Sequence, residues 1–309
     1  MPTTEPTRPY DPLRTSLYTP DELLAGYDGT FESTRDFAIY RHFSDFGRRA
    51  PSREEAHAER LHDWSIDEAL RSFLNESKGG RSRGARLVAI MGGHGKKRGE
   101  PEYTSVARLA HELAGVGSTV ASGGGPGIME AANLGASLAT YDAGAVDEAV
   151  AVLAREVDYR APAYFETARD VRARFTNPTA SLAVPTWFYG HEPTNLFGSH
   201  IAKYFSNGLR EDTLLAIACG GVVFAPGKAG TWQEIFMDLA QNFYKTHEVL
   251  SPMVFLGRDH YERETGIAPI VRKLVGWSSH AAALEKLILV TDDVAEAVEF
   301  LSANAPRDP

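Results

Sequence analysis

Short apolar runs that end in glycine or a turn alternate with helical stretches over most of the chain. The runs LVAIMGG, STVASGGG, SLAVPTW and GGVVFAPG are followed later by PMVFLG and by LILVTD at residues 287–292. A continuous apolar run fits a strand that is buried on both faces of a parallel sheet. The sequence therefore predicts an α/β fold with a doubly wound, mostly parallel, Rossmann-like sheet.

Helical spacing of apolar residues predicts the elements between these strands. The predicted helices cover residues 101–115, 126–139, 147–157, 209–219, 231–246 and 293–303. The helix at 147–157 is a candidate insertion into the alternating pattern.

The first part of the chain has a different character. Residues 1–20 are rich in Pro and Thr and are expected to be irregular, whereas residues 21–75 have helical spacing. The stretch SKGGRSRGAR at 77–86 is typical of a linker. We therefore expect a helical N-terminal extension at residues 1–80 and a Rossmann-like nucleotide-binding domain at residues 81–309.

The charge and hydropathy of the chain limit the kinds of partner that it can be expected to bind. The formal net charge is −9 and there is no basic tract, which disfavours a nucleic-acid partner. The N-terminus lacks the apolar core of a signal peptide, and no apolar stretch approaches the ~18 residues of a membrane span. We expect a cytoplasmic protein with no membrane partner.

Cysteine and histidine usage points away from a metal centre. Cys219 is the single cysteine and lies in the apolar run LLAIACGGVVFA, so a small buried apolar side chain is expected rather than a nucleophile. No Cys/His cluster has zinc spacing, so no metal is expected. His57 and His62 lie in the helical extension and are expected at the surface.

The first glycine turn, SGGGPG at residues 122–127, follows a predicted strand and opens a predicted helix. Glycines let the backbone approach a ligand closely, and the free N–H groups of a helix start favour an anion. Gly124, Gly125 and Gly127 are therefore candidate phosphate-binding residues. The alternative is a tight turn without a ligand, in which Glu130 only complements the helix N-terminus.

The second turn, PGKAGTWQE at residues 226–234, has the same placement between a strand and a helix. Its candidate binding residues are Gly227, Lys228, Gly230 and Thr231, since they offer backbone, hydroxyl and ammonium donors. Glu234 is expected in the first turn of the helix, beside the ligand. The alternative role for this carboxylate is to complement the helix dipole.

This second turn resembles the PGGxGTxxE motif of the lysine-decarboxylase-like (LOG) family, whose members are nucleoside 5′-monophosphate phosphoribohydrolases. SGGGPGIMEAANLGA and MGGHG resemble the family's earlier glycine loops, and Arg210 in NGLRED fits the place of the family's catalytic arginine. The resemblance covers about residues 87–260. Within the family, the run VPTWFYGHEPTN resembles the bacterial purine/pyrimidine nucleotide 5′-monophosphate nucleosidases more than the short cytokinin-activating members. Lys228 and Gln233 depart from the motif, where the family has Gly and Glu.

The resemblance implies hydrolysis of the N-glycosidic bond of a nucleoside 5′-monophosphate, with no cofactor. It implies that Glu234 stabilises the oxocarbenium-like transition state or activates water, and that Arg210 orients Glu234 and grips the ligand. It also implies a homodimer or larger homo-oligomer. The apolar stripe on the helix after the second turn, Trp232, Ile235, Phe236, Leu239 and Phe243, fits either a subunit contact or packing onto the sheet.

Several other residues have two interpretations. Trp187, Phe188 and Tyr189 either stack on a base or belong to the core. His94 is a candidate phosphate contact, and Asn195 either binds the ligand or forms a turn. Arg172 and Arg174 are interpreted as a solvated face. Two alternative functions remain: a non-catalytic nucleotide sensor or carrier on the same fold, and a pathway enzyme for a modified nucleotide.

Overall fold

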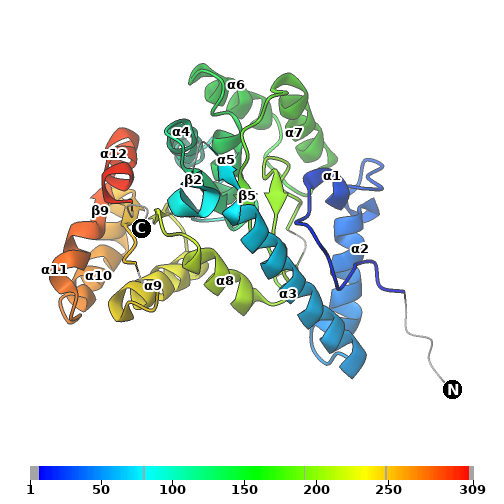
Figure 1. The fold of residues 1–309 in the computed structure, drawn as a ribbon. Coiled ribbons are helices and arrows are strands. Elements are labelled where there is room, and N and C mark those ends of the chain that lie inside the picture. Colours follow the sequence, from blue (N-terminus) through cyan, green and yellow to red (C-terminus); the bar gives the residue numbers. More distant parts are fainter. Residues whose placement is uncertain (1–6, 79–80, 191, 248, 306–309) are drawn as a thin grey trace.

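The computed structural model describes residues 7–78, 81–190, 192–247 and 249–305. A seven-stranded sheet in the order β6-β5-β4-β3-β7-β8-β9 forms its centre, and every neighbouring pair is parallel (Figure 1). The strands are β3 (Leu87–Met91), β4 (Thr119–Ser122), β5 (Leu182–Ala183), β6 (His200–Ile201), β7 (Gly221–Phe224), β8 (Met253–Leu256) and β9 (Ile288–Thr291). The chain is an α/β protein with a Rossmann-like fold, as predicted.

Helices cover both faces of the sheet and also form the N-terminal part. The α-helices are α1 (Pro20–Leu23), α2 (Arg35–His42), α3 (Arg53–Asn75), α4 (Pro101–Gly115), α5 (Ile128–Ser137), α6 (Gly144–Leu153), α7 (Pro162–Arg174), α8 (Asn207–Ala216), α9 (Ala229–Tyr244), α10 (Ile267–Val275), α11 (Ala281–Leu284) and α12 (Val294–Asn304). Shorter 3-10 or π turns are η1 (Phe31–Ser33), η2 (Phe43–Gly47), η3 (Arg83–Arg86), η4 (His260–Glu264) and η5 (Glu285–Leu287).

Alternate residues of the central strands enter two separate hydrophobic cores. Leu87, Ala89 and Met91 of β3 pack with residues of α3, α8, α9 and α10, whereas Val88 and Ile90 pack with α4, α5, α6, α7 and α12. All five residues of β3 are buried. This explains why the strands are continuous apolar runs rather than alternating ones.

The sheet is wound in two directions from β3. The chain moves outward through β4, β5 and β6, and then returns to the other side of β3 to add β7, β8 and β9. Open α/β sheets of this kind bind ligands beyond the carboxyl ends of the strands, where the direction of winding reverses. Here that place lies at the ends of β3 and β7.

The structure corrects several predicted elements. The predicted strand at 181–187 is a regular strand only at Leu182–Ala183, followed by an isolated bridge between Thr186 and Tyr204. Pro185 lies between them and has no N–H with which to extend the ladder. β6, α7, α10 and α11 were not predicted. The described residues of the expected linker, 77–78 and 81–86, have regular structure: β1 (Ser77–Lys78) and β2 (Arg81–Ser82) pair antiparallel, and η3 then leads directly into β3.

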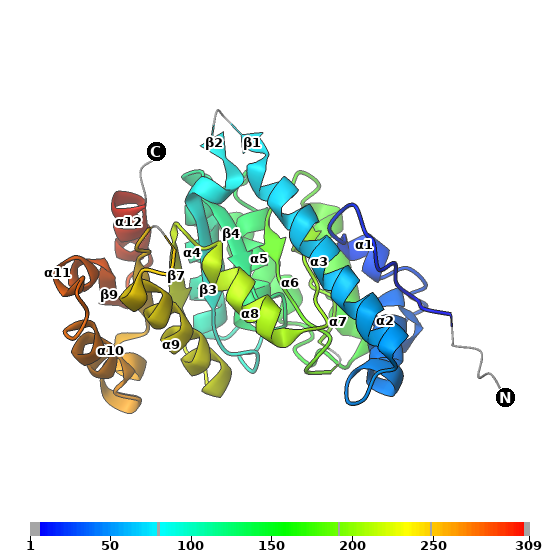
Figure 2. The same cartoon turned by 60° about the horizontal axis from the view of Figure 1, so that its bottom comes forward.

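The N-terminal segment packs onto the sheet and contributes to one of its cores. Tyr10, Tyr18, Ile66 and Phe73 belong to the same cluster as the residues of β3 and α8. Tyr18 also forms an antiparallel bridge with Ile201 of β6, with N–H···O distances of 3.0 and 2.9 Å. Figure 2 shows α3 on the same side of the molecule as α8 and α9.

His62 is buried, which overturns its predicted surface position, whereas His57 is exposed as predicted. His62 lies on the face of α3 that also carries the buried Ile66 and Phe73. Burial lowers the pKa of His62. A neutral ring explains its contacts, since Nδ1 donates to Asp63 at 3.2 Å and Nε2 accepts from the Tyr18 hydroxyl at 2.9 Å.

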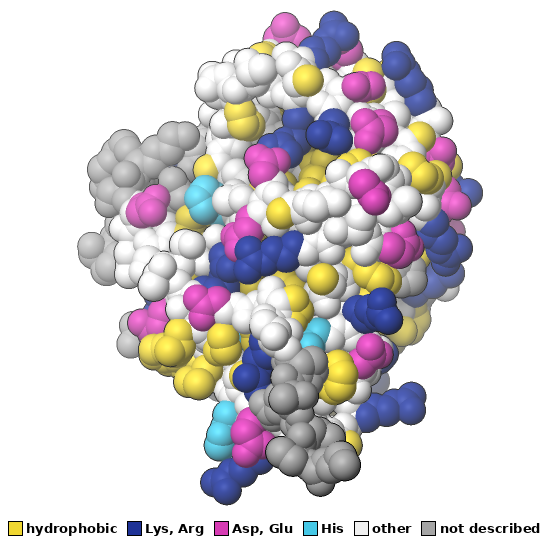
Figure 3. Space-filling view, turned by 90° about the vertical axis from the view of Figure 1, so that its right-hand side faces the viewer, with side chains coloured by type: hydrophobic (Ala, Val, Ile, Leu, Met, Phe, Trp, Pro, Cys, Tyr) yellow, Lys and Arg dark blue, Asp and Glu magenta, His cyan; other side chains and the backbone are white. Residues whose placement is uncertain are grey.

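The surface over the N-terminal part carries mixed charge. On the face seen in Figure 3, basic and acidic side chains are interspersed and do not gather into one patch. Among the described residues, no helix is both long and apolar enough to cross a membrane.

Candidate active site at the carboxyl edge of the sheet

Three loops meet beyond the ends of the central strands β4, β3 and β7. The loop after β3 contacts both glycine turns: Gly93 N donates to the carbonyl of Pro226 at 3.1 Å, and Ile128 N donates to the carbonyl of Gly93 at 3.3 Å. The two predicted glycine turns therefore lie on either side of the loop that contains His94. This is the position that the winding of the sheet favours for a ligand.

The first glycine turn is tightly covered by other parts of the protein. Gly124 and Gly127 have φ values of +75° and +71°, which disfavour other residues. A Cβ on Gly127 would lie 2.7 Å from the carbonyl oxygens of Gly93 and His94, and a Cβ on Gly123 would lie 2.5 Å from a guanidinium nitrogen of Arg210. The N–H of Gly124 donates to the Ser122 hydroxyl at 3.0 Å. Close packing of protein groups thus already requires these glycines.

The second turn leaves a helix start open. In α9 the first helical donor is the N–H of Trp232, which bonds to the carbonyl of Lys228, and no side chain caps the helix. A Cβ on Gly230 would meet nothing within 4 Å. Lys228 has a φ of −116° and an exposed side chain, so the loop accommodates this departure from glycine without strain. The start of α9 is the more open of the two candidate anion sites.

Arg210 lies in the first turn of α8, which Ser206 caps. Its Nε donates to the carbonyl of Val184 at 2.8 Å, and one terminal nitrogen donates to the carbonyl of Gly123 at 3.2 Å. The other terminal nitrogen lies 3.5 Å from Oε1 of Glu234. The structure therefore brings together the two residues predicted as a pair, and it fixes the guanidinium over the first glycine turn.

Glu234 lies in the second turn of α9, not in the first as predicted, because the helix begins at Ala229. A carboxylate this far from the helix start has little effect on the exposed N–H groups, so complementing the helix dipole does not explain it. Burial raises the pKa of Glu234 to about 7, against the opposing effect of Arg210. Among the described residues, Glu234 forms an ion pair with Arg210. This carboxyl group can exchange a proton near neutral pH.

A second carboxyl group, that of Glu192, enters the site and was not predicted. Its Oε2 is enclosed and has no hydrogen-bond partner among the described residues. The carboxyl carbon and Oε2 both lie 3.2 Å from where a Cβ on Gly125 would be. Burial raises the pKa of Glu192, while Arg210, Lys203 and His94 oppose that shift. The sequence offered one signal: a Glu in the run VPTWFYGHEPTN, which already resembled a nucleotide-binding segment.

Gln233 and Tyr189 complete the rim of the site. Gln233 donates to Glu211 at 2.6 Å, where a glutamate would be repelled, which explains this departure from the family motif. The Tyr189 hydroxyl accepts from Asn207 at 3.0 Å. Burial and then the charge of Glu211 raise the pKa of Tyr189, with Arg210 and the other site carboxylates also acting on it. Tyr189 is exposed and borders the carboxylates.

Trp187 is buried and so cannot stack on a ligand. Its indole N–H donates to Asp36 of α2 at 2.8 Å, and Asp36 also accepts from Thr194 at 2.6 Å and from Lys203 at 2.8 and 2.9 Å. One buried carboxylate of the extension therefore anchors both ends of the segment that contains Glu192.

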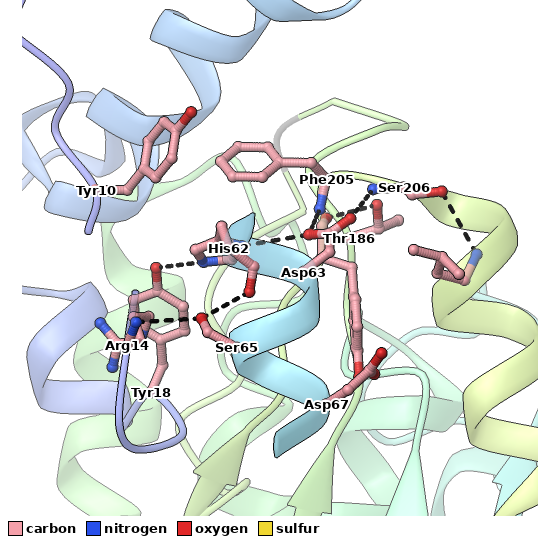
Figure 4. Close-up of polar contacts among 12 residues, drawn as sticks. Tyr10, Arg14, Tyr18, His62, Asp63, Ser65, Asp67, Thr186, Phe205 and Ser206 are labelled. Atoms are coloured by element: carbon pink, nitrogen blue, oxygen red, sulfur yellow. Dashed lines mark hydrogen bonds and ion pairs between the residues drawn. The ribbon is translucent and has the colours of Figure 1, made fainter. Parts of the chain in front are cut away.

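Asp63 of α3 anchors the segment that leads to Arg210. Its two oxygens accept from the backbone N–H groups of Phe205 and Ser206, both at 2.9 Å (Figure 4). Asp67 accepts from the Tyr204 hydroxyl at 2.7 Å. The N-terminal extension thus determines where α8 begins.

The remaining singled-out residues have structural contacts. Glu130 does not serve the helix N-terminus alone: it forms a buried ion pair with Arg98 and accepts from Tyr103 at 2.9 Å. Asn195 forms a turn by accepting from the N–H of Phe197 at 3.0 Å, and its amide donates to Asn133 at 2.9 Å. Cys219 is only half-buried, and burial raises the pKa of its thiol, which fits no nucleophile.

The two arginines of α7 and the apolar stripe of α9 lie as follows. Arg172 pairs with Asp21 at 2.8 Å and Arg174 pairs with Glu148, both toward the surface. Ile235 and Leu239 are buried in the core, whereas Trp232 is 37% exposed, so only part of the stripe packs onto the sheet. No group of three or more His, Cys, Asp or Glu residues in the described ranges is arranged to hold a metal ion.

No protein-family model matches the chain, and no curated protein matches it. Solved structures with a similar fold include a molybdenum cofactor binding protein from Rippkaea orientalis, with 12% identity, a TM-score of 0.43, and coverage of 70% of this chain and 95% of that one. A molybdenum cofactor carrier protein from Chlamydomonas reinhardtii has 16% identity, a TM-score of 0.40, and coverage of 71% and 98%. Similarities this distant carry no argument about the function.

Proposed function

We propose that this protein hydrolyses the N-glycosidic bond of a nucleoside 5′-monophosphate to give the free base and ribose 5-phosphate. The observation that carries the proposal is the pair formed by Glu234 and Arg210 beside the open start of α9. It unites a buried carboxyl group, whose pKa is raised to about 7, with a fixed cation 3.5 Å away. The likeness of residues 226–234 to the LOG-family motif supports the same function.

The 5′-phosphate binds at the start of α9 in this proposal. The backbone N–H groups before Trp232 have no helical acceptor, and the helix dipole favours negative charge there. Gly230 leaves room for a phosphate oxygen, the Thr231 hydroxyl lies beside Gly227, and the exposed Lys228 adds a positive charge. Anchoring the phosphate supplies binding energy that positions the sugar for reaction.

Glu234 acts on the ribosyl carbon. As a carboxylate it stabilises the positive charge of the oxocarbenium-like transition state and accepts a proton from the attacking water. Arg210 remains charged at neutral pH and so cannot act as an acid. Its role is to hold Glu234 in place, since its other nitrogens are fixed by the carbonyls of Val184 and Gly123. Tyr189 is 58% exposed and is available to stack on the base, and the adjacent Phe188 is 37% exposed.

A hydrolysis assay tests the proposal. Purified protein is incubated with AMP, GMP, CMP, UMP and IMP and with the matching nucleosides, and the released base and ribose 5-phosphate are quantified. We expect release from at least one monophosphate, little release from nucleosides, and a loss of about 10²- to 10⁴-fold in kcat for Glu234→Gln. Release that is unchanged in Glu234→Gln would contradict the proposed role.

The non-catalytic sensor or carrier is the second candidate. The observation that favours it is that two of the three guanidinium nitrogens of Arg210 already bond to backbone carbonyls, which leaves one for Glu234 or a ligand. Calorimetry distinguishes the two functions: a carrier binds a monophosphate without releasing base, and Glu234→Gln then leaves binding intact.

A further inference from the structure

Glu192 is held in place by contacts on both sides of it. Its N–H donates to the carbonyl of Gly190 at 2.9 Å, and Gly190 has a φ of +110° that favours glycine. Two residues later, the Thr194 hydroxyl donates to Asp36 at 2.6 Å. The backbone around Glu192 is therefore fixed by the N-terminal extension. These contacts hold the Glu192 side chain against the first glycine turn.

The carboxyl group of Glu192 has no protein partner for its Oε2 among the described residues, although that atom is enclosed. A buried polar atom without a partner costs free energy, and it is tolerated where a ligand supplies the missing hydrogen bond. The atom lies over Gly125 in the first glycine turn. Since Arg210 lies over Gly123 of the same turn, both groups face the same small region.

The two site glutamates differ in their pairing with Arg210. Glu234 has an ion pair with it at 3.5 Å, whereas Glu192 feels its charge without an ion pair. The negative charge of Glu192 also acts on Glu234 and raises its pKa. Two carboxyl groups that interact in this way do not both ionise easily. The ion pair with Arg210 favours Glu234 as the ionised member of the two.

We propose that Glu192, in its protonated form, donates a proton to the leaving base, while Glu234 acts on the ribosyl carbon. This rests on the proposed function. The bond between C1′ and the base nitrogen breaks, and its electron pair stays with the base, which takes the proton of Glu192. Water forms the new bond to C1′ and gives a proton to Glu234. The products are the neutral base and ribose 5-phosphate, and the proton passes from Glu234 back to Glu192 through solvent.

A leaving group that needs no proton separates this role from a structural one. The variant Glu192→Gln is compared with the wild type on the best monophosphate substrate and on 4-nitrophenyl ribofuranoside 5-phosphate, which departs as a phenolate. We expect kcat to fall about 10²- to 10⁴-fold on the nucleotide. We expect a fall of less than about 10-fold on the nitrophenyl compound, because general acid catalysis is not needed there.

Glu59→Gln is the matched control. Glu59 also has an enclosed oxygen without a partner, and burial raises its pKa to about 7, but it lies against Gly47 in the N-terminal extension. We expect this variant to keep wild-type rates on both substrates. A loss of equal size on both substrates in Glu192→Gln, or no loss on the nucleotide, would overturn the proton-donor role.

The pH profile gives a second measurement that does not depend on the nitrophenyl compound. In the wild type, kcat on the nucleotide should pass through a maximum with pH, because Glu234 has to be ionised and Glu192 protonated in the same molecule. The residual activity of Glu192→Gln should lack the fall at high pH, and a fall that persists unchanged would overturn the role. A wild type that releases base from no nucleotide would instead refute the proposed function, and this inference with it.

Discussion

The N-terminal extension and the carboxyl edge of the sheet both bury carboxylates, but they treat them differently. Asp36 and Asp63 in the extension each accept several short hydrogen bonds. At the sheet edge, Glu192 keeps an enclosed oxygen without a partner in the described structure, and so does Asp238 farther along α9. A buried carboxylate whose oxygens all accept hydrogen bonds helps to hold the fold together. A buried carboxyl oxygen without a partner lowers the stability of the folded state and is typical of functional sites.

Glu59 is an exception within the extension, since it also has an unpartnered oxygen. It lies by the turn at Gly47, and its neighbours Glu55 and Asp63 raise its pKa after burial does. A single such group does not make a site. The sheet edge differs because its glutamates share Arg210, two glycine turns and an open helix start.

The largest effect on this comparison should come from Asp36→Ala. Removing the carboxylate leaves Lys203 buried without its counter-ion and frees Trp187 and Thr194, so we expect a loss of about 3–5 kcal/mol in the free energy of unfolding. Urea denaturation measures it. Asp45→Ala is the control, because its pair with Arg41 is exposed and spans 3.9 Å. Equal losses of stability in both variants would show that Asp36 contributes no more to the fold than an exposed carboxylate does.

Asp238→Asn should raise the free energy of unfolding, whereas Asp36→Ala lowers it. Burial alone raises the pKa of Asp238 to about 8, so the folded state holds a proton that the unfolded chain releases near pH 4. Asp238 therefore does not reduce the free energy of unfolding below pH 4. Between pH 4 and pH 8 it lowers this free energy progressively, by about 1.4 kcal/mol per unit of pKa shift. The asparagine variant should gain stability at pH 8 and little at pH 4. Urea melts at the two pH values check this, and a loss at pH 8 would contradict it.

A smaller loss is expected for Asp63→Asn. The amide keeps one acceptor for the N–H groups of Phe205 and Ser206 but turns a donor toward the other, which costs about 1–3 kcal/mol. Because Arg210 lies one turn after this cap, kcat should fall more than KM changes. Asp67→Asn is the matched control, since it makes the same change at the acceptor of the Tyr204 hydroxyl but touches no backbone N–H of the cap. A variant with wild-type kcat and reduced stability would limit Asp63 to a structural role.

The smallest effect should be that of Gly230→Ala. Its Cβ would enter open space in the first turn of α9, so we expect a gain of about 0.5 kcal/mol in stability. If phosphate binds there, the methyl group should raise KM for the monophosphate without changing kcat. Gly208→Ala is the control, since it also meets nothing within 4 Å but lies at the start of α8. An unchanged KM would show that the phosphate does not bind at the start of α9.

Much of the fold could be predicted because the strands are buried on both faces. β3, β4, β7, β8 and β9 are continuous apolar runs, and α4 occupies the predicted residues 101–115. β6 was missed because two residues, His200 and Ile201, are too few to show a pattern. α7 could have been found, since Tyr164, Phe165, Ala168 and Val171 have helical spacing and Pro162 stands at its start.

The candidate site could be predicted only where a residue belonged to a motif that resembles a known family. Arg210 and Glu234 follow from such motifs, and the structure pairs them. Glu192 was not singled out, although it lies in the run VPTWFYGHEPTN, because what distinguishes it is an enclosed Oε2 without a partner, and a missing contact has no sequence pattern. His62 was misplaced for a related reason: a histidine in a helix looks exposed until the segment containing Tyr18 is known to cover it.

The bridge between Tyr18 and Ile201 has a consequence for how the protein behaves in crowded solution. β6 is the last strand on its side of the sheet, and an open edge invites pairing with another chain. The segment before α1 occupies that edge at Ile201 through two backbone bonds. A chain that lost this segment would keep its central strands but expose the unpaired backbone groups of β6. We therefore expect proteolysis near the N-terminus to cause aggregation, and this aggregation should precede any loss of activity through unfolding.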